Sequence, residues 1–140
     1  MASNAILTYR DTLDFLLEFT DYEKITKYKY DIATFSLDRV RDLMKAAGSP
    51  HERFRSIHVA GTKGKGSTAT MIQCVLTAAG FRSGLYTSPH LNRIEERMTV
   101  DGALMPERDL IEVVNALVPY TRKARAERPH ESPTYFELVT

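Results

Sequence analysis

The sequence predicts an α/β fold in which a parallel, P-loop NTPase-like sheet follows a helical N-terminal segment. Three features support this fold class: a β-rich run at 56–60, the glycine-rich stretch Gly61–Gly66 after it, and a helix-forming segment before a second β-rich run at 84–87. Strand, tight turn, crossover helix and strand make a βαβ unit, whose strands are parallel. We therefore expect Ile57–Ala60 and Leu85–Thr87 to be adjacent parallel strands joined by a right-handed crossover.

Composition excludes several classes of protein. The chain has 140 residues, 19 Lys and Arg against 18 Asp and Glu, and a formal net charge of +1. A balanced charge does not favour nucleic-acid binding. No apolar run is long enough for a membrane span, and the N-terminus shows no secretory signal pattern. The single cysteine, Cys74, cannot form an internal disulfide, which fits a reducing cytoplasm. These features indicate a cytoplasmic protein that binds neither membrane nor nucleic acid.

The first part of the chain is predicted to be helical. Thr8 is a suitable N-cap for an amphipathic helix that ends near Phe19. The polar and aromatic stretch 21–35 has no clean period, and we expect an ordered loop there. Ser36 is a suitable N-cap for a second helix, which Gly48 and the following proline should end.

Later elements follow from similar signals. The run 97–100 predicts a strand that ends in an Asp101-Gly102 turn. Pro106 is a suitable first residue for a further helix, which Pro119 should kink or end. An apolar segment begins at Thr134. We accordingly expect two regions: residues 1–50 as an N-terminal helical segment, and residues 51–140 as an α/β region.

The strongest chemical signal is the loop Gly61–Ser67, which lies between a predicted strand and a predicted helix. Small residues let consecutive N–H groups point at an anion, and the helix adds the positive end of its dipole. Lys65 could then reach the β- and γ-phosphates of a nucleotide. The strict P-loop pattern is not met, because Gly66 separates Lys65 from Ser67. The alternative is a glycine-rich turn with two solvated lysines.

A second signal, Thr87–Leu91, directly follows the second predicted strand. Loops at the carboxyl ends of parallel strands share one edge of the sheet, where ligands bind. Ser88 could therefore face the same phosphates as Lys65. The alternative is that Ser88 and Pro89 only open a turn.

A third signal is the segment Thr134-Tyr135-Phe136-Glu137. A threonine and a glutamate three residues apart form a capping box at the start of a helix, which is a purely structural role. The two aromatic residues also offer a stacking surface for a flat heterocycle. Both readings are compatible with the pattern.

Four stretches in this order resemble the folylpolyglutamate synthases and dihydrofolate synthases of the Mur ligase superfamily. They are 58–67, 84–91, 96–98 and 134–137, and Leu37–Val40 resembles a further stretch of the family. The resemblance covers nearly the whole chain but only the amino-terminal part of a typical member. It implies the Mur ligase ATPase domain as the fold, with residues 51–140 as the amino-terminal portion of that P-loop ATP-binding domain.

The resemblance also implies an activity, which is the ATP-dependent addition of L-glutamate to a folate or to dihydropteroate. ATP would phosphorylate the carboxylate, and the amino group of glutamate would displace phosphate. By motif matching, Lys65 would be catalytic and Thr62, Lys63, Gly64, Lys65, Gly66 and Ser67 would hold ATP. Ser88 would bind Mg²⁺. Residues Thr134, Tyr135, Phe136 and Glu137 would contact the organic substrate. We expect small-molecule partners only, and a monomer for the full-length protein.

The chain departs from the family pattern in three respects. Lys63 stands where the family usually has asparagine, and 34–36 replace an Asp-Leu-Gly stretch common in dihydrofolate synthases, which disfavours dihydropteroate as substrate. The family's acidic magnesium ligand, magnesium-binding histidine, carbamylated lysine and carboxy-terminal domain would lie beyond Thr140. We therefore expect an amino-terminal fragment that is inactive alone. Two alternatives are a small P-loop kinase and a non-catalytic nucleotide-binding fragment.

Overall fold

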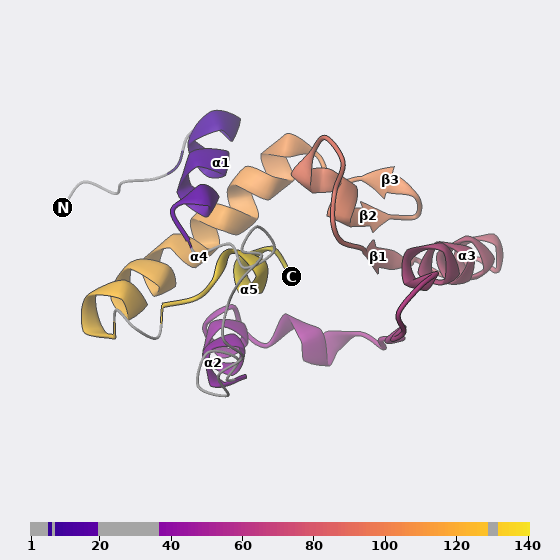
Figure 1. Cartoon of the computed structure of the whole chain (residues 1–140), viewed down its shortest axis with the longest axis horizontal. Helices are drawn as coiled ribbons and strands as arrows, with labels where there is room; N and C mark the ends of the chain where they lie inside the picture. Colours follow the sequence, from indigo (N-terminus) through magenta and orange to yellow (C-terminus); the bar gives the residue numbers. More distant parts are fainter. Residues whose placement is uncertain (1–5, 7, 20–36, 129–131) are drawn as a thin grey trace. The chain divides into compact units, whose positions relative to one another are not determined.

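The computed structural model describes residues 6, 8–19, 37–128 and 132–140 (Figure 1). These residues divide into two compact units, one of residues 1–54 and 111–140 and one of residues 55–110. Within the described parts of the chain, no helix combines the length and the apolar character that a membrane crossing requires. The predicted loop 21–35 and the predicted N-cap Ser36 lie outside the described residues.

The first unit is built from helices. Its elements are α1 (Tyr9–Leu17), α2 (Asp38–Ala46), the 3-10 turn η2 (Pro50–Arg53), most of α4 (Glu107–Glu127) and α5 (Tyr135–Val139). Their apolar faces meet in a core that includes Leu16, Phe19, Leu43, Val114, Val118, Tyr135, Leu138 and Val139. Burial of these side chains is the main stabilising contribution in this unit.

Local capping explains where the helices begin and end. Thr8 Oγ1 accepts a hydrogen bond from the Asp11 N–H at 3.1 Å, and the Asp11 carboxylate accepts in return from the Thr8 N–H. This capping box confirms the predicted start of α1. Gly48 has φ +80°, a left-handed conformation that ends α2 as the sequence predicts. The N-cap of α2 is Leu37, which makes no side-chain cap bond.

Helix α4 runs through Pro119, so the prediction that this proline could end the helix is wrong. A proline inside a helix lacks one N–H donor and weakens the helix locally. Val114 and Val118 before it and Ala124 after it are all buried, at most 5 % exposed. Packing on both sides of Pro119 therefore keeps the chain helical.

The second unit contains α3 (Lys65–Ala78), β1 (Gly84–Tyr86), the 3-10 turn η3 (Ile94–Arg97), β2 (Met98–Val100) and β3 (Ala103–Leu104). The three strands form an antiparallel sheet in the order β1-β2-β3, with Leu85 opposite Thr99. The turn between β2 and β3 is Asp101-Gly102, and both residues have positive φ, as a two-residue hairpin turn requires. The sequence predicts this turn and β2, but not β3.

Polar contacts hold α3 against the sheet. Gln73 Nε2 donates to the Ser83 carbonyl at 3.3 Å and to Thr99 Oγ1 at 3.1 Å. One turn later, the hydroxyls of Thr77 and Ser83 are 2.7 Å apart. Ser83, just before β1, thus contacts Thr77 near the C-terminal end of α3, and Thr99, which is paired with Leu85 in β1, contacts Gln73 one turn earlier in the helix. Strand β1 therefore runs antiparallel to α3.

The described residues do not form the predicted parallel sheet. Residues 55–60 contain no strand, β1 pairs with β2 in antiparallel fashion, and Ile57 is 64 % exposed. The pairing of β1 with β2 is local, because β2 follows β1 closely in the chain, and it leaves β1 as the edge strand of the described sheet. The segment 55–60 has no hydrogen-bonded neighbouring strand in the described parts of the chain.

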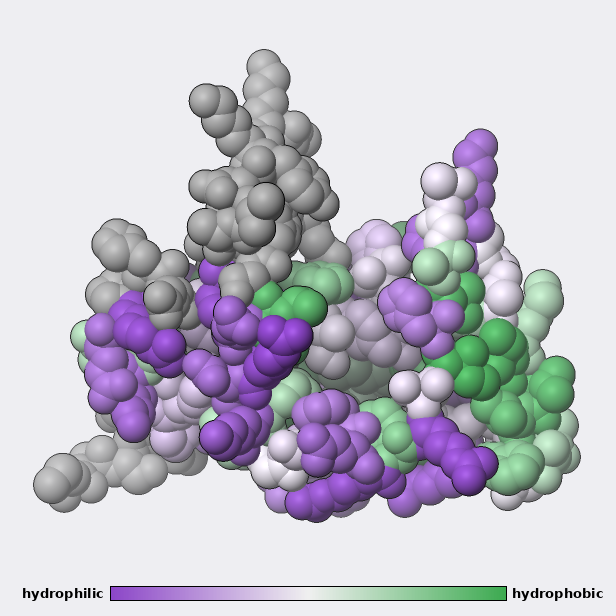
Figure 2. All heavy atoms as spheres, turned by 90° about the horizontal axis from the view of Figure 1, so that it is seen from below, coloured by the Kyte–Doolittle hydropathy of each residue, from purple (hydrophilic) through white to green (hydrophobic). Residues whose placement is uncertain are grey.

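An apolar face of the second unit is left uncovered. Figure 2 shows hydrophobic side chains gathered over α3, where Met71 and Val75 are each 67 % exposed. Phe81, just after the helix, is 64 % exposed. The side of α3 that packs on β1 carries the polar residues Gln73 and Thr77, so the more apolar side faces outward.

This exposure gives the first testable prediction. Val75→Lys should change the free energy of unfolding of the 140-residue chain by no more than about 0.5 kcal/mol, because the side chain is already in solvent. Leu43→Ala, at a site 1 % exposed, should cost about 2–5 kcal/mol. Urea denaturation measures both. A large loss of stability in Val75→Lys would mean that this face is covered.

Candidate functional site

The loop before α3 has the backbone shape that anion binding requires. Gly61 has φ +155° and Gly64 has φ +76°, and α3 begins at Lys65 directly after Gly64. Only glycine adopts such left-handed backbone angles readily. Gly64 is the N-cap, and no side chain caps the helix. The first N–H groups of α3 therefore lack the side-chain acceptor that most helices have.

The electrostatics of this loop favour an anion. All residues from Gly61 to Thr68 are exposed, and two lysines, Lys63 and Lys65, lie at the positive end of a 14-residue helix. The Lys65 ammonium donates to the Gly61 carbonyl at 2.8 Å, which folds the side chain back over the loop. The Lys65 charge is therefore held beside the N-terminus of α3. A phosphate at this position would meet both the ammonium and the backbone N–H groups.

The Ser88 segment follows β1 and is held by a glutamate carboxylate. Glu96 Oε2 accepts from the Leu91 N–H at 2.7 Å, and Oε1 accepts from the N–H groups of Asn92 and Arg93 at 3.0 and 2.9 Å. These bonds stabilise the charged carboxylate and lower the pKa of Glu96, the bond from Leu91 most. Residues 91–93 are thereby fixed.

A buried arginine anchors the same segment from the other side. Arg97 is 2 % exposed, and its Nε donates to His90 Nδ1 at 2.8 Å. Because Nδ1 accepts this bond, a neutral His90 ring carries its proton on Nε2. Arg97 Nη1 lies 3.4 Å from the Tyr86 hydroxyl, at the end of β1. Ser88 itself is exposed between these two fixed points.

A charged cluster that sequence analysis missed joins this region to the start of α4. Arg93 contacts the buried Glu95 at 3.4 Å and Glu107 at 2.6 Å. The hydrogen bonds that the Arg93 guanidinium donates to these carboxylates, first of all to Glu95, raise the pKa of Arg93. The only sequence signal was the dense run of charges at 93–97, which by itself indicates a solvated surface.

The third predicted segment lies in the helical unit. Thr134 and Glu137 form a capping box at the start of α5, with the Thr134 N–H donating to Glu137 Oε2 at 2.8 Å. The structural reading of this pattern is therefore confirmed. Thr134 and Tyr135 are buried, and Glu137 forms an ion pair with Arg39. Phe136 is 38 % exposed and is the accessible aromatic ring of the segment.

The predicted site residues therefore fall into two groups. The loop 62–67 and Ser88 belong to the second unit, where β1 runs back along α3. The segment 134–137 belongs to the first unit. Among the described residues, no three His, Cys, Asp or Glu side chains are grouped as a metal site would need.

The structure thus contains a glycine-containing loop, a helix start without a side-chain cap and a following strand, which are the features from which the sequence predicts a phosphate site. No family model matches the chain. A dihydrofolate synthase/folylpolyglutamate synthase of Bacillus subtilis is 33 % identical over 126 residues, which are 87 % of this chain and 29 % of that protein. A probable bifunctional folylpolyglutamate synthase/dihydropteroate synthase of Haloferax volcanii is 36 % identical over 124 residues, 86 % of this chain and 15 % of that protein.

Solved structures agree with these relatives. Folylpolyglutamate synthetase from Lactobacillus casei superposes with a TM-score of 0.78 at 31 % identity, over 95 % of this chain and 31 % of that one. A folylpolyglutamate synthase complex with AMPPCP and folate gives 0.79 at 30 % identity, over 95 % and 30 %. The chain belongs to the folylpolyglutamate synthase and dihydrofolate synthase family. It spans less than a third of the length of these relatives.

The loop geometry gives a binding prediction. Lys65→Ala should weaken the affinity of the 140-residue chain for ATP at least tenfold, because it removes a cation held beside the helix N-terminus. Lys45→Ala is the matched control, since Lys45 is an exposed lysine on α2 and should leave affinity unchanged. Isothermal titration calorimetry measures both. Equal affinity in the Lys65 variant and the wild type would refute this role.

The lowered pKa of Glu96 gives a pH prediction. A carboxyl whose pKa is lower in the folded state stabilises that state above its unfolded pKa, and this contribution is lost as pH falls through the folded pKa. The amides of residues 91–93 should therefore lose hydrogen-exchange protection as the pH falls below the usual titration range of a glutamate carboxyl. Glu96→Gln should abolish this pH dependence, whereas Glu112→Gln, on the exposed face of α4, should not. Protection that is independent of pH in the wild type would contradict the assignment.

Proposed function

We propose that this chain forms the phosphate-binding part of an ATP-dependent ligase that adds L-glutamate to folates. The observation that carries the proposal is the uncapped N-terminus of α3 behind the loop Gly61–Gly64, in a chain whose relatives are folylpolyglutamate synthases. Solved structures of such relatives contain AMPPCP or ADP, and one contains folate as well. The substrates are thus ATP, L-glutamate and a folate, with dihydropteroate disfavoured.

The loop would hold the nucleotide. Backbone N–H groups of Thr62–Ser67 surround the β- and γ-phosphates, and the Lys65 ammonium exchanges its bond to the Gly61 carbonyl for a phosphate oxygen. A substrate carboxylate oxygen attacks the γ-phosphorus and ADP leaves, which gives an acyl phosphate. The glutamate amine then attacks the acyl carbon, phosphate leaves, and the amine loses a proton. Positioning and charge neutralisation dominate such chemistry, and Lys65 supplies the charge.

Magnesium is the metal that this reaction class uses. The described residues could supply one or two hydroxyl oxygens as weak ligands to it. Mg²⁺ is commonly held by one or two protein oxygens together with substrate phosphates and water. The exposed Ser88 hydroxyl supplies one such oxygen, and Ser67 is a second candidate on the first turn of α3. When bound, the ion neutralises charge on the phosphates.

The segment Thr134–Glu137 would contact the organic substrate. Its aromatic contribution comes from Phe136, because Tyr135 is only 5 % exposed. An exposed phenyl ring suits stacking against a flat heterocycle. Thr134 and Glu137 contribute by holding the first turn of α5 in place.

We further propose that Ile57–Ala60 is a strand of a parallel sheet whose other strands lie outside these 140 residues. Two observations support this. Ile57, Val75 and Phe81 are large apolar residues of the second unit and are each more than 60 % exposed, as is typical of a surface that another part of a protein covers. The relatives are also more than three times as long as the matched segment. A parallel sheet buried on both faces would cover these side chains.

A second proposal concerns the 140-residue chain by itself, which we expect to bind MgATP without ligating glutamate. In the described parts of the chain, no three His, Cys, Asp or Glu side chains are grouped so that they could hold a metal ion, and hydroxyl groups alone hold Mg²⁺ weakly. We expect the full-length protein to act on its small-molecule substrates as a monomer.

The activity is tested with a protein that extends this chain to the length of its relatives. Incubated with MgATP, a reduced folate and labelled glutamate, it should form labelled folate product and one ADP per glutamate added. Lys65→Ala should lower this rate by at least a hundredfold, and Lys45→Ala should not change it.

The 140-residue chain under the same conditions should form no labelled product. Two results would contradict the account. Absence of glutamate transfer by the long protein would refute the proposed function, and transfer by the short chain at a similar rate would refute the second proposal.

A further inference from the structure

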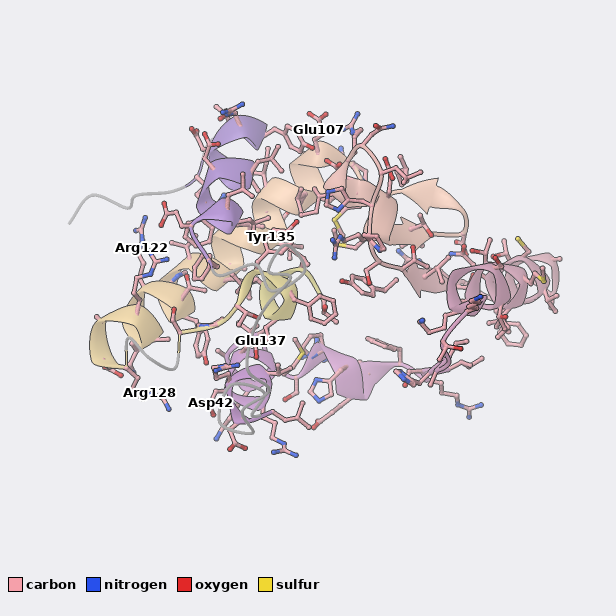
Figure 3. The ribbon with its side chains drawn as sticks, viewed as in Figure 1. Asp42, Glu107, Arg122, Arg128, Tyr135 and Glu137 are labelled. Atoms are coloured by element: carbon pink, nitrogen blue, oxygen red, sulfur yellow. The ribbon has the colours of Figure 1, made fainter. Side chains whose placement is uncertain are left out.

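A shielded ion pair joins helix α2 to the proposed substrate segment. Arg39 Nε and Nη2 donate to Glu137 Oε1 at 3.2 and 3.1 Å. The two side chains are only 13 % and 12 % exposed. Figure 3 shows the labelled Glu137 between α5 and α2. Both residues lie in the helical unit, although 98 positions separate them in the sequence.

The Glu137 carboxylate is fully engaged by these contacts. Oε1 accepts from Arg39, and Oε2 accepts from the Thr134 N–H at 2.8 Å. The Glu137 N–H in turn donates to Thr134 Oγ1 at 3.2 Å. A carboxylate held in this way fixes the backbone at the start of α5 relative to Arg39.

The other interhelical ion pairs of this unit are different. Arg125 with Glu18 and Arg128 with Asp42 have side chains about half exposed. Solvent-exposed pairs contribute little to geometry or stability. A nearly buried ion pair is far more costly to break, because losing one partner leaves an uncompensated charge away from solvent. Arg39 is therefore the ion-pair partner that fixes α5.

Helix α5 depends on such an external contact because it has only five residues. A helix this short has almost no intrinsic stability. Its residues Tyr135, Leu138 and Val139 are buried, and Phe136 points to the surface. The direction in which Phe136 faces is therefore set by the packing of α5 and by the Arg39–Glu137 pair.

We propose that Arg39 is a positioning residue for the organic substrate, acting through Glu137 on the orientation of Phe136. The inference rests on the proposed function, since it gives Phe136 the role of stacking on the flat ring of a folate. It assigns a role to Leu37–Val40, a stretch for which no other function follows from the site.

The test uses the protein extended to the length of its relatives. Arg39→Ala should raise KM for the folate about tenfold or more, leave KM for ATP within twofold, and keep the wild-type circular dichroism spectrum. Arg39→Lys, which keeps the charge but not the two-pronged contact, should give an intermediate KM for the folate. Arg41→Ala is the matched control, because Arg41 lies on the same helix in an exposed pair with Asp38 and should behave as wild type.

A double-mutant cycle separates positioning from general destabilisation. If Arg39 acts through Phe136, the effects of Arg39→Ala and Phe136→Ala on KM for the folate should not add. Additive effects, or an equal rise of KM for both substrates, would overturn the inference. If Arg39→Ala does not fold, the same cycle is measured with Arg39→Lys and Phe136→Ala, and the additivity of their effects on KM for the folate decides. Failure of the proposed function is distinguishable, because the wild-type protein would then transfer no glutamate.

Discussion

The left-handed backbone of Gly64 is the constraint on which the proposed chemistry depends. With φ +76° at this residue, α3 begins at Lys65 without any side-chain cap. The N–H groups of the first turn stay available, and the Lys65 ammonium folds back over the loop to the Gly61 carbonyl. A side chain at Gly64 would meet no neighbouring atom, so the requirement for glycine here is conformational and not steric. Everything proposed for ATP follows from this local arrangement.

Within each of the two units, charged side chains hold segments that have little secondary structure. Arg97 and Glu96 fix the chain on either side of Leu91, and Arg39 fixes the short helix α5. In each case, a side chain with several donors or acceptors replaces the regular hydrogen bonds of a helix or sheet. Such contacts specify one geometry, because each leaves a costly unpaired charge when it breaks. The proposed substrate segment depends on them more than on its own helical propensity.

The sequence predicts the elements that local signals determine. The capping pairs Thr8–Asp11 and Thr134–Glu137, the glycine that ends α2 and the Asp101-Gly102 turn are all found. The start of α3 behind its loop is also found. The sheet could not be predicted in the same way, since the partner of β1 is a tertiary choice and β2 is its partner in the described residues. The Arg39–Glu137 and Arg97–His90 contacts escaped prediction because charged residues in a sequence usually indicate solvent. The assignments of Thr62–Ser67, Ser88 and Thr134–Glu137 to ligands remain proposals.

The most direct measurement of the central claim is a nuclear magnetic resonance titration of the isotopically labelled 140-residue chain with MgATP. The account predicts that the largest amide shifts fall on residues 61–67, with a downfield change at Lys65 and Gly66 as their N–H groups donate to phosphate. Smaller shifts should reach residues 87–90, and α1 should show none. Shifts centred on another part of the chain, or no saturable shifts at millimolar MgATP, would contradict the claim that this loop is a nucleotide phosphate site.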